Sequence, residues 1–235
     1  HQNLSLILNR PNLRIAELSH RLDQLYSSRS SLDREILSIK HQIRAGAQLV
    51  RGETLSEGRY RLRQTIGSGA LATVWLARDQ QSEKDVAVRV LKTEYSHDMA
   101  RVRHFKDTAY RMTEFRHKSI IRIIQEPTVE DGLIYFTEEF IENGDLERVL
   151  NTSLIDKEQC IKKLSDVCDA LVLVHKNEAA HGDIKPSNIL FGRDCQVTLT
   201  DFEFTTFPRT SFSDATIGVH PLFSAPEVFK GMKIM

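Results

Sequence analysis

Four polar residues toward the C-terminal end of the chain place an acid, a cation and an amide close together. Asp183, Lys185 and Asn188 stand at offsets 0, +2 and +5 of one short segment, and Asp201 follows a strand-like run. Phosphoryl transfer uses such a set: a carboxylate orients a hydroxyl, a cation stabilises the developing negative charge, and an amide with a second carboxylate holds magnesium. The spacing therefore predicts Asp183 and Lys185 as catalytic residues, and Asn188 and Asp201 as metal ligands.

The segment 181–188, followed by Asp201-Phe202-Glu203, resembles the catalytic loop and metal motif of eukaryotic-type (Hanks-type) protein kinases. The lysine two residues after Asp183 resembles the class directed at serine and threonine. The resemblance implies ATP and Mg²⁺ as cofactors and transfer of the γ-phosphate to a protein hydroxyl. It also implies an α+β, two-lobed kinase-like fold, with an antiparallel sheet in the small lobe and helices in the large lobe.

A glycine-rich segment lies further upstream, between two strand-like runs. Gly67-Ser68-Gly69 would let a hairpin turn bring backbone N–H groups onto phosphates. This signal is weak alone, but before the later motifs it resembles the kinase glycine-rich loop, with Ala72 at the third glycine. Glu139 and Ile141 would then offer backbone groups to adenine, and Asp145 would meet the ribose. The resemblance implies a nucleotide-binding set of Gly67, Gly69, Val74, Ala87, Arg89, Glu139, Ile141, Asp145 and Leu190.

The strand-like run 86–89 departs from the family at its last residue. Arg89 stands where the family has a phosphate-binding lysine, and arginine keeps the charge without the compact shape. The glutamate that pairs with this lysine would fall on Thr108. Glu138 takes a usually apolar position at the back of the nucleotide pocket, where an unpaired carboxylate would be costly. We hypothesise that Glu138 pairs with Arg89; the alternative is that Glu138 turns to solvent.

Other departures favour a second function. Gly182 replaces an arginine that pairs with a phosphorylated activation loop in the family, so dependence on such a switch is not expected. Glu203 replaces the glycine of the metal motif, and His220 takes the position of a threonine that bonds the catalytic residues. Together with Arg89 and Thr108, these changes leave open a pseudokinase, that is, a nucleotide-binding or structural interaction module on an inherited scaffold.

Residues 12–45 carry a heptad pattern that predicts a long helix and a coiled coil. The apolar positions follow 3-4 spacing, which only Arg29 interrupts: Ile15, Leu18, Leu22, Leu25, Leu32, Ile36, Ile39 and Ile43. The serine-rich segment 27–31 leaves open a hairpin of two shorter helices. Homo-oligomerisation or a partner helix through residues 15–43 is expected, with a helix packed on its own domain as the alternative. The arm could itself be the functional part, as an assembly element.

Changes of pattern divide the chain into four parts. They are a coiled-coil arm at 1–45, a linker at 46–58, a small lobe at 59–141, and a partial large lobe through the activation segment at 142–235. Strands are expected at 60–66, 73–77, 85–91, 120–125 and 133–141, and helices at 98–116 and from 156 onward. We expect the family's large lobe to continue with several helices beyond Met235.

The composition limits the class of partner and compartment. The net charge is +0, although residues 1–63 hold 11 basic and 6 acidic residues, so neither nucleic acid nor a membrane is an expected partner. No apolar run approaches the ~20 residues of a membrane span. Cys160, Cys168 and Cys195 form no C-x-x-C pair, which predicts free thiols and a cytoplasmic location. A protein substrate or a regulatory protein is the expected partner.

Overall fold

The computed structural model describes residues 10–45, 49–152, 157–202, 205, 222–224 and 226. The chain divides into two compact units, His1–Gln48 and Leu49–Met235. The described part of the first unit is one helix, α2 (Arg10–Ala45), as predicted over 12–45. The serine-rich segment does not interrupt this helix, so the alternative of a hairpin is wrong. Serine is only a mediocre helix former, but leucine and arginine, which are strong helix formers, lie beside and within the segment and favour a continuous helix.

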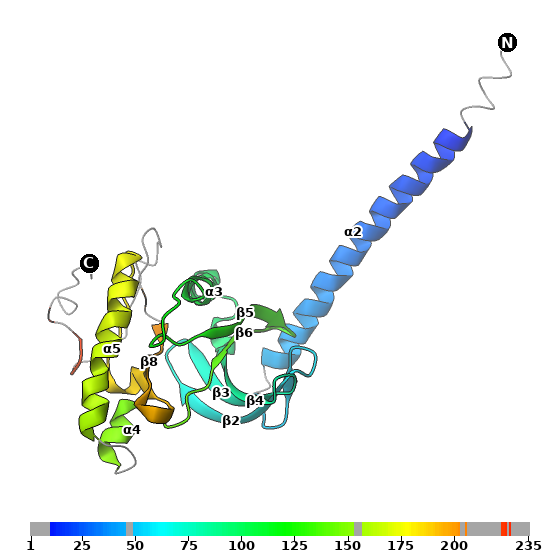
Figure 1. The fold of residues 1–235 in the computed structure, drawn as a ribbon. Coiled ribbons are helices and arrows are strands. Elements are labelled where there is room, and N and C mark those ends of the chain that lie inside the picture. The colour runs from blue at the N-terminus through cyan, green and yellow to red at the C-terminus, as the bar shows by residue number, and fades with distance from the viewer. Residues whose placement is uncertain are drawn as a thin grey trace. The chain divides into compact units, whose positions relative to one another are not determined.

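A six-stranded antiparallel sheet forms the small lobe of the second unit, in the order β1-β2-β3-β4-β6-β5 (Figure 1). The structure agrees with the predicted kinase-like fold. Strand β5 begins at Ile123, so the strand predicted at 120–125 is wrong in its first half: Ile120 makes only an isolated bridge with Leu199 and is buried in the large-lobe core. The strands are β1 (Thr54–Leu55), β2 (Tyr60–Ser68), β3 (Ala72–Asp79), β4 (Lys84–Leu91), β5 (Ile123–Glu130) and β6 (Leu133–Glu139).

Strand β4 is covered on both faces, which explains its nearly continuous apolar sequence. Val86, Val88 and Val90 belong to a core cluster with Tyr60 on one side of the sheet. Leu91 belongs to a different cluster, which includes residues of helix α3 (Met99–Met112). Because successive strand side chains alternate between faces, Arg89 lies on the same face as Leu91, toward α3.

Helix α3 begins and ends through side-chain contacts with its own backbone. The Asp98 carboxylate accepts hydrogen bonds from the N–H groups of Ala100 and Arg101, which caps the first turn. The helix ends at Met112, before the predicted end at 116. The Thr113 hydroxyl donates to the Tyr110 carbonyl at 2.6 Å, a local bond that competes with continuation of the helix.

The large lobe packs helices against a short hairpin. Buried Phe191 and Leu199 of the hairpin share a core with Val174 of α5. Helix α4 was not expected from the sequence, although Asp145, which caps it by accepting from the Arg148 N–H at 2.8 Å, is a signal for it. These elements are α4 (Leu146–Asn151), α5 (Lys157–Lys176), β7 (Ile189–Phe191) and β8 (Val197–Leu199).

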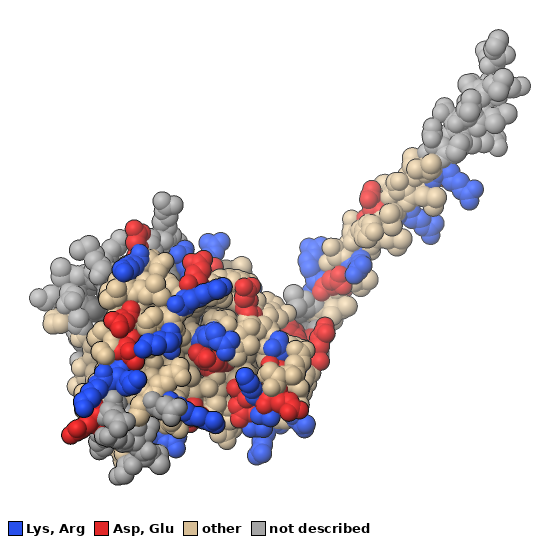
Figure 2. All heavy atoms as spheres, viewed as in Figure 1, with Lys and Arg blue, Asp and Glu red and all other residues tan. Residues whose placement is uncertain are grey.

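The surface of the second unit carries charges of both signs. Basic and acidic side chains are interspersed over the face that Figure 2 shows. Such a surface lacks the single-sign field that attracts nucleic acid over that face. Within the described ranges, no helix is both long and apolar enough to cross a bilayer.

An ion pair between half-buried Arg59, just before β2, and buried Asp79, at the end of β3, links these two neighbouring strands. Arg59 donates two hydrogen bonds to the Asp79 carboxylate, at 3.1 and 3.0 Å, and Gln81 and Ser82 donate two more. The hydrogen bonds from Arg59 hold the pKa of the Asp79 carboxyl well below its usual range. We expect Asp79→Asn to lower the free energy of unfolding at pH 7 by about 2 kcal/mol, as for hydrogen bonds to a charged group.

The same pair makes this stability depend on pH with a definite sign. Because the pKa of Asp79 is lower in the folded state, its contribution is present above the unfolded pKa of about 4 and is lost as the pH falls further. The difference between wild type and Asp79→Asn should therefore shrink below about pH 4, measured by urea unfolding at several pH values. Asp85→Asn, at a more exposed carboxylate, is the control and should cost less than about 1 kcal/mol. A difference for Asp79→Asn that does not change with pH contradicts the assignment.

Candidate active site

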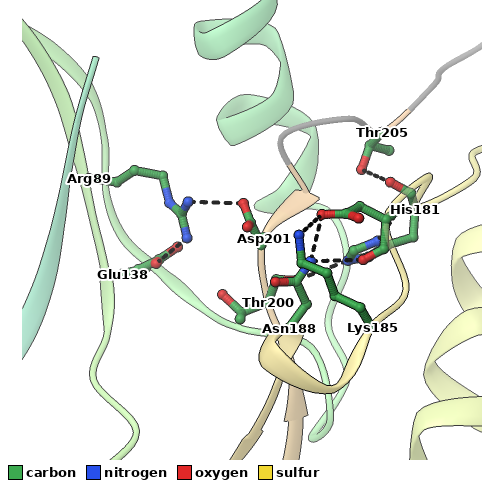
Figure 3. A network of polar contacts seen from close by, with 9 residues as sticks. Arg89, Glu138, His181, Lys185, Asn188, Thr200, Asp201 and Thr205 are labelled. Atoms are coloured by element: carbon green, nitrogen blue, oxygen red, sulfur yellow. Dashed lines mark hydrogen bonds and ion pairs between the residues drawn. The ribbon is translucent and has the colours of Figure 1, made fainter. Parts of the chain in front are cut away.

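The structure brings three of the predicted residues together on one loop (Figure 3). The buried Asp183 carboxylate accepts at Oδ2 from Lys185 Nζ, at 2.6 Å, and from Asn188 Nδ2, at 2.9 Å. Asn188 Nδ2 also donates to the Asp183 backbone carbonyl at 2.8 Å. Pro186 begins a short 3-10 helix (Pro186–Asn188) and restricts Lys185 to an extended conformation. This turn brings Asn188 back onto Asp183.

His181 holds this loop against the end of β8, a role that the sequence reasoning missed. Its Nε2 bonds the Thr200 carbonyl at 2.9 Å, and the Asp183 N–H donates to its Nδ1 at 3.2 Å. A nitrogen that accepts carries no proton, so the ring is neutral with its hydrogen on Nε2. Burial lowers the pKa of His181, in agreement with this tautomer. The ring also packs on Phe202, with 4.5 Å between ring centroids.

Asp201 follows β8 in an unusual backbone conformation. Its φ is 65°, in the left-handed region that costs energy for a residue other than glycine, although aspartate tolerates it better than most. The preceding Thr200 N–H donates to the Asn188 carbonyl at 3.0 Å, which ties this turn to the catalytic loop. This backbone hydrogen bond therefore links Asn188 to the residue directly before Asp201, so the two predicted metal ligands lie close together.

Arg89 bridges two carboxylates across the back of the site. Its Nη2 donates to Glu138 Oε1 at 3.0 Å, and its Nη1 donates to Asp201 Oδ1 at 3.1 Å (Figure 3). The predicted pairing of Glu138 with Arg89 is confirmed, and the alternative of a solvent-exposed Glu138 is wrong, since its side chain is only 5% exposed. The antiparallel register pairs Arg89 with Phe136 and Ala87 with Glu138, which places Glu138 on the face that Arg89 occupies.

The Glu138 carboxylate depends on this cation. Burial raises the pKa of the Glu138 carboxyl, and the charge of the Arg89 guanidinium is the largest effect that opposes the rise. Without Arg89, the buried carboxyl would favour its neutral form. The negative charge of the buried Glu138 carboxylate is thus stabilised by the Arg89 guanidinium.

Helix α3 contributes Thr108 where the family has its paired glutamate. The Thr108 hydroxyl is buried and makes no hydrogen bond in the structure. It lines a narrow, mainly apolar pocket together with Arg89, Glu138 and Phe202. Glu138, which pairs with the strand cation, comes from the neighbouring strand β6.

The glycine-rich segment forms the predicted hairpin between β2 and β3. Gly67 pairs with Val74, and the Gly69 N–H donates to the Ala72 carbonyl at 2.8 Å. A side chain added at Gly67 would meet only Val74, at 3.8 Å. Val74 in turn pairs with Arg89 on β4, so the hairpin continues directly into the strand of the bridging cation.

The residues predicted to bind adenine and ribose lie at the end of β6, in the segment that follows it, and on β7. The Glu139 N–H donates to the Arg122 carbonyl at 2.9 Å. Ile141 is half-buried against the large-lobe core. Asp145 and Leu190 form an isolated antiparallel bridge, so the structure brings these two predicted residues together. The Asp145 Oδ1 accepts the hydrogen bond from the Arg148 N–H that caps α4.

Several sequence predictions fall outside the described residues. They include Glu203 and His220. Within the described part of the chain, Cys168 carries a free thiol, as predicted.

The antiparallel sheet, the helical large lobe and the loop around Asp183 define a protein of the kinase class. A family model described as "Protein kinase domain" matches residues 60–234, which is most of the chain. The chain therefore belongs to the protein kinase family.

Curated relatives of this chain are Ser/Thr protein kinases from bacteria and animals. It is 29% identical over 150 residues to the serine/threonine-protein kinase PrkC of Bacillus subtilis, covering 63% of this chain and 23% of the relative. It is 30% identical over 148 residues to PknB of Mycobacterium leprae (61% and 24%) and 27% identical over 179 residues to SIK2 of Gallus gallus (75% and 22%). The chain thus spans about a quarter of the length of these relatives.

Proposed function

We propose that this domain transfers the γ-phosphoryl group of ATP to a serine or threonine hydroxyl of a protein, with Mg²⁺. The observation that carries the proposal is the buried Asp183 carboxylate, bonded at one oxygen by both Lys185 and Asn188. A kinase needs its base positioned in this way, because its catalysis consists mostly of positioning and charge stabilisation. Similarity to Ser/Thr protein kinases supports the substrate class. A protein partner and a cytoplasmic location belong to the same proposal.

Each residue of the loop has a role in this reaction. Both side-chain bonds to Asp183 use Oδ2, so we assign Oδ1 to the substrate hydroxyl and its proton. The substrate oxygen bonds to the γ-phosphorus, the bond to the bridging oxygen breaks, and ADP leaves with that electron pair. Lys185 lies 2.6 Å from Oδ2 and places a positive charge beside the transferred group.

The donor set at Asn188 and Asp201 fits magnesium. The Asn188 amide nitrogen is committed to Asp183, which leaves the amide oxygen as a ligand, and Asp201 adds carboxylate oxygens. Magnesium prefers oxygen ligands and commonly takes one or two protein side chains plus substrate phosphates. When bound, it neutralises charge on the phosphates.

Arg89 takes the role of the phosphate-binding cation in this proposal. Glu138 holds Nη2 of its guanidinium, and Nη1, which contacts Asp201, would be the group to bind the phosphates if Asp201 held magnesium. In the family, the equivalent pair joins a strand to a helix, so movement of the helix can break it. Here both partners lie on neighbouring strands, β4 and β6. We infer that the cation keeps its place whatever the position of α3.

Thr108→Val tests this independence from α3. We expect kcat/KM within about twofold of wild type, because Thr108 supplies no charge to Arg89. The free energy of unfolding should rise by about 1 kcal/mol, since the change removes a buried hydroxyl that lacks a hydrogen bond. Steady-state kinetics and urea unfolding measure the two effects. A tenfold loss of kcat/KM with unchanged stability would show that α3 takes part in the chemistry.

One observation favours the second candidate, a pseudokinase that binds nucleotide without transfer. The Arg89 guanidinium lies 3.1 Å from Asp201, where it competes with magnesium for that carboxylate. The experiment that separates the candidates combines a thermal shift by ATP, with and without Mg²⁺, and transfer of labelled phosphate to a generic Ser/Thr acceptor such as casein. Transfer supports the kinase. A thermal shift without transfer supports the pseudokinase.

A further inference from the structure

Helix α2 exposes one continuous apolar stripe. The stripe has heptad spacing, with Ile15, Leu22, Arg29 and Ile36 at a positions and Leu18, Leu25, Leu32 and Ile39 at d positions. Its seven apolar side chains are between 48% and 61% exposed. Residues at this spacing lie on one face of a helix, and a continuous exposed apolar face marks an interaction surface.

We propose that a second copy of α2 covers this stripe in antiparallel orientation, forming a two-stranded coiled coil. The two-fold axis passes near Ser27, and each layer of the core pairs residues equally far from Ser27 on either side. The layers are Ile15 with Ile39, Leu18 with Ile36, Leu22 with Leu32, and Leu25 with Arg29 of the second copy. This register places every a position opposite a d position, as antiparallel packing requires.

Arg29 decides between the two orientations. A parallel pair in register would place Arg29 against Arg29 of the second copy in one core layer, where like charges repel. The antiparallel pair places Arg29 opposite Leu25, so that its aliphatic stem covers an apolar side chain and its guanidinium extends to the rim. An acidic side chain lies near this guanidinium: Oδ2 of Asp33 on the same helix is 3.8 Å from Arg29 Nε.

Charges beside the stripe support the same register. Arg21 and Glu35 occupy g positions, and g positions face each other across an antiparallel pair. In the proposed register, Arg21 of each copy meets Glu35 of the other, which gives two opposite-charge pairs. A register displaced by one heptad in either direction separates them. The small side chain of Ser28 meets its own equivalent near the axis.

The arrangement has a consequence for the attached domains. Each chain leaves the coiled coil after Ala45, and in an antiparallel pair these two exits lie at opposite ends. At 1.5 Å per residue, the two Ala45 positions are about 54 Å apart. Through α2 alone, the dimer therefore separates its two kinase domains instead of pairing their sites. This inference does not depend on catalytic activity.

Disulfide cross-linking of the purified whole protein tests the orientation, after replacement of Cys160, Cys168 and Cys195 by serine. One preparation carries Leu18→Cys and another carries Ile36→Cys. On oxidation, we expect a covalent dimer only after the two are mixed, because equivalent positions lie about 27 Å apart in the antiparallel pair. Cross-linking of Leu18→Cys alone would mean a parallel pair and would overturn the proposal.

Light scattering tests whether the protein forms a dimer at all. Wild type should have the mass of two chains, and Leu22→Asp should have the mass of one, since it buries a charge in a core layer. His20→Asp is the matched control: it changes the outer face of the same helix, and the dimer should persist. A monomeric wild type, or a dimer that survives Leu22→Asp, overturns the proposal.

Discussion

Asp183→Asn should lower kcat for phosphate transfer by about a thousandfold while leaving the affinity for ATP within about threefold. Asparagine keeps the shape of the side chain but cannot take the hydroxyl proton at Oδ1, and general base catalysis contributes about 10²–10⁴-fold. It also removes the negative charge that Lys185 contacts at 2.6 Å. Because the lost interaction is needed only during transfer, the effect should appear in kcat and not in KM.

The measurement is steady-state kinetics with labelled ATP, with a thermal shift as a check on folding. Asp131→Asn, in the turn between β5 and β6, is the matched control and should transfer phosphate at the wild-type rate. If Asp183→Asn kept more than about a tenth of the wild-type kcat, Asp183 would not be the base.

Glu138→Leu should produce the second large effect, on both stability and nucleotide binding. It leaves Arg89 buried beside Asp201 (Figure 3), and breaking a buried ion pair by removing one partner typically costs about 3–5 kcal/mol. We expect a loss of about 3 kcal/mol in the free energy of unfolding. We also expect about a tenfold higher KM for ATP, because Glu138 no longer positions Arg89.

A double variant separates packing from function. Arg89→Met with Glu138→Leu replaces the pair by apolar side chains, which often restores stability. We expect unfolding free energy within about 1 kcal/mol of wild type but strongly reduced phosphate transfer, since the cation is gone. Urea unfolding and the transfer assay measure the two effects. A double variant that transfers phosphate normally would exclude Arg89 from the reaction.

The sequence predicted the parts of the site that depend on short-range geometry. Asp183, Lys185 and Asn188 lie within six residues, so their spacing nearly determines their contacts once a turn forms at Pro186. The pair of Arg89 and Glu138 spans two strands. It was predictable because a buried carboxylate needs a partner, and Arg89 is a cation whose usual partner in the family, a glutamate, is replaced by Thr108.

Other features needed the tertiary structure. The contact of Arg89 with Asp201 depends on how the two lobes meet, and the sequence carries no local sign of it. The bond from His181 to Thr200 depends on the return of β8 to the loop. The prediction of a strand at 120–125 was wrong in its first half. A short apolar run does not distinguish a buried strand from another buried segment, and Ile120 and Ile121 are buried in the large-lobe core.

Phosphate transfer by the purified protein tests the central claim most directly. The protein is incubated with labelled ATP and a Ser/Thr acceptor, with and without Mg²⁺, and the labelled residues are identified by mass spectrometry. We expect phosphoserine or phosphothreonine, whose formation requires Mg²⁺ and is lost in Asp183→Asn. Nucleotide binding that depends on Mg²⁺, without transfer to the acceptor or to the protein itself, would contradict it.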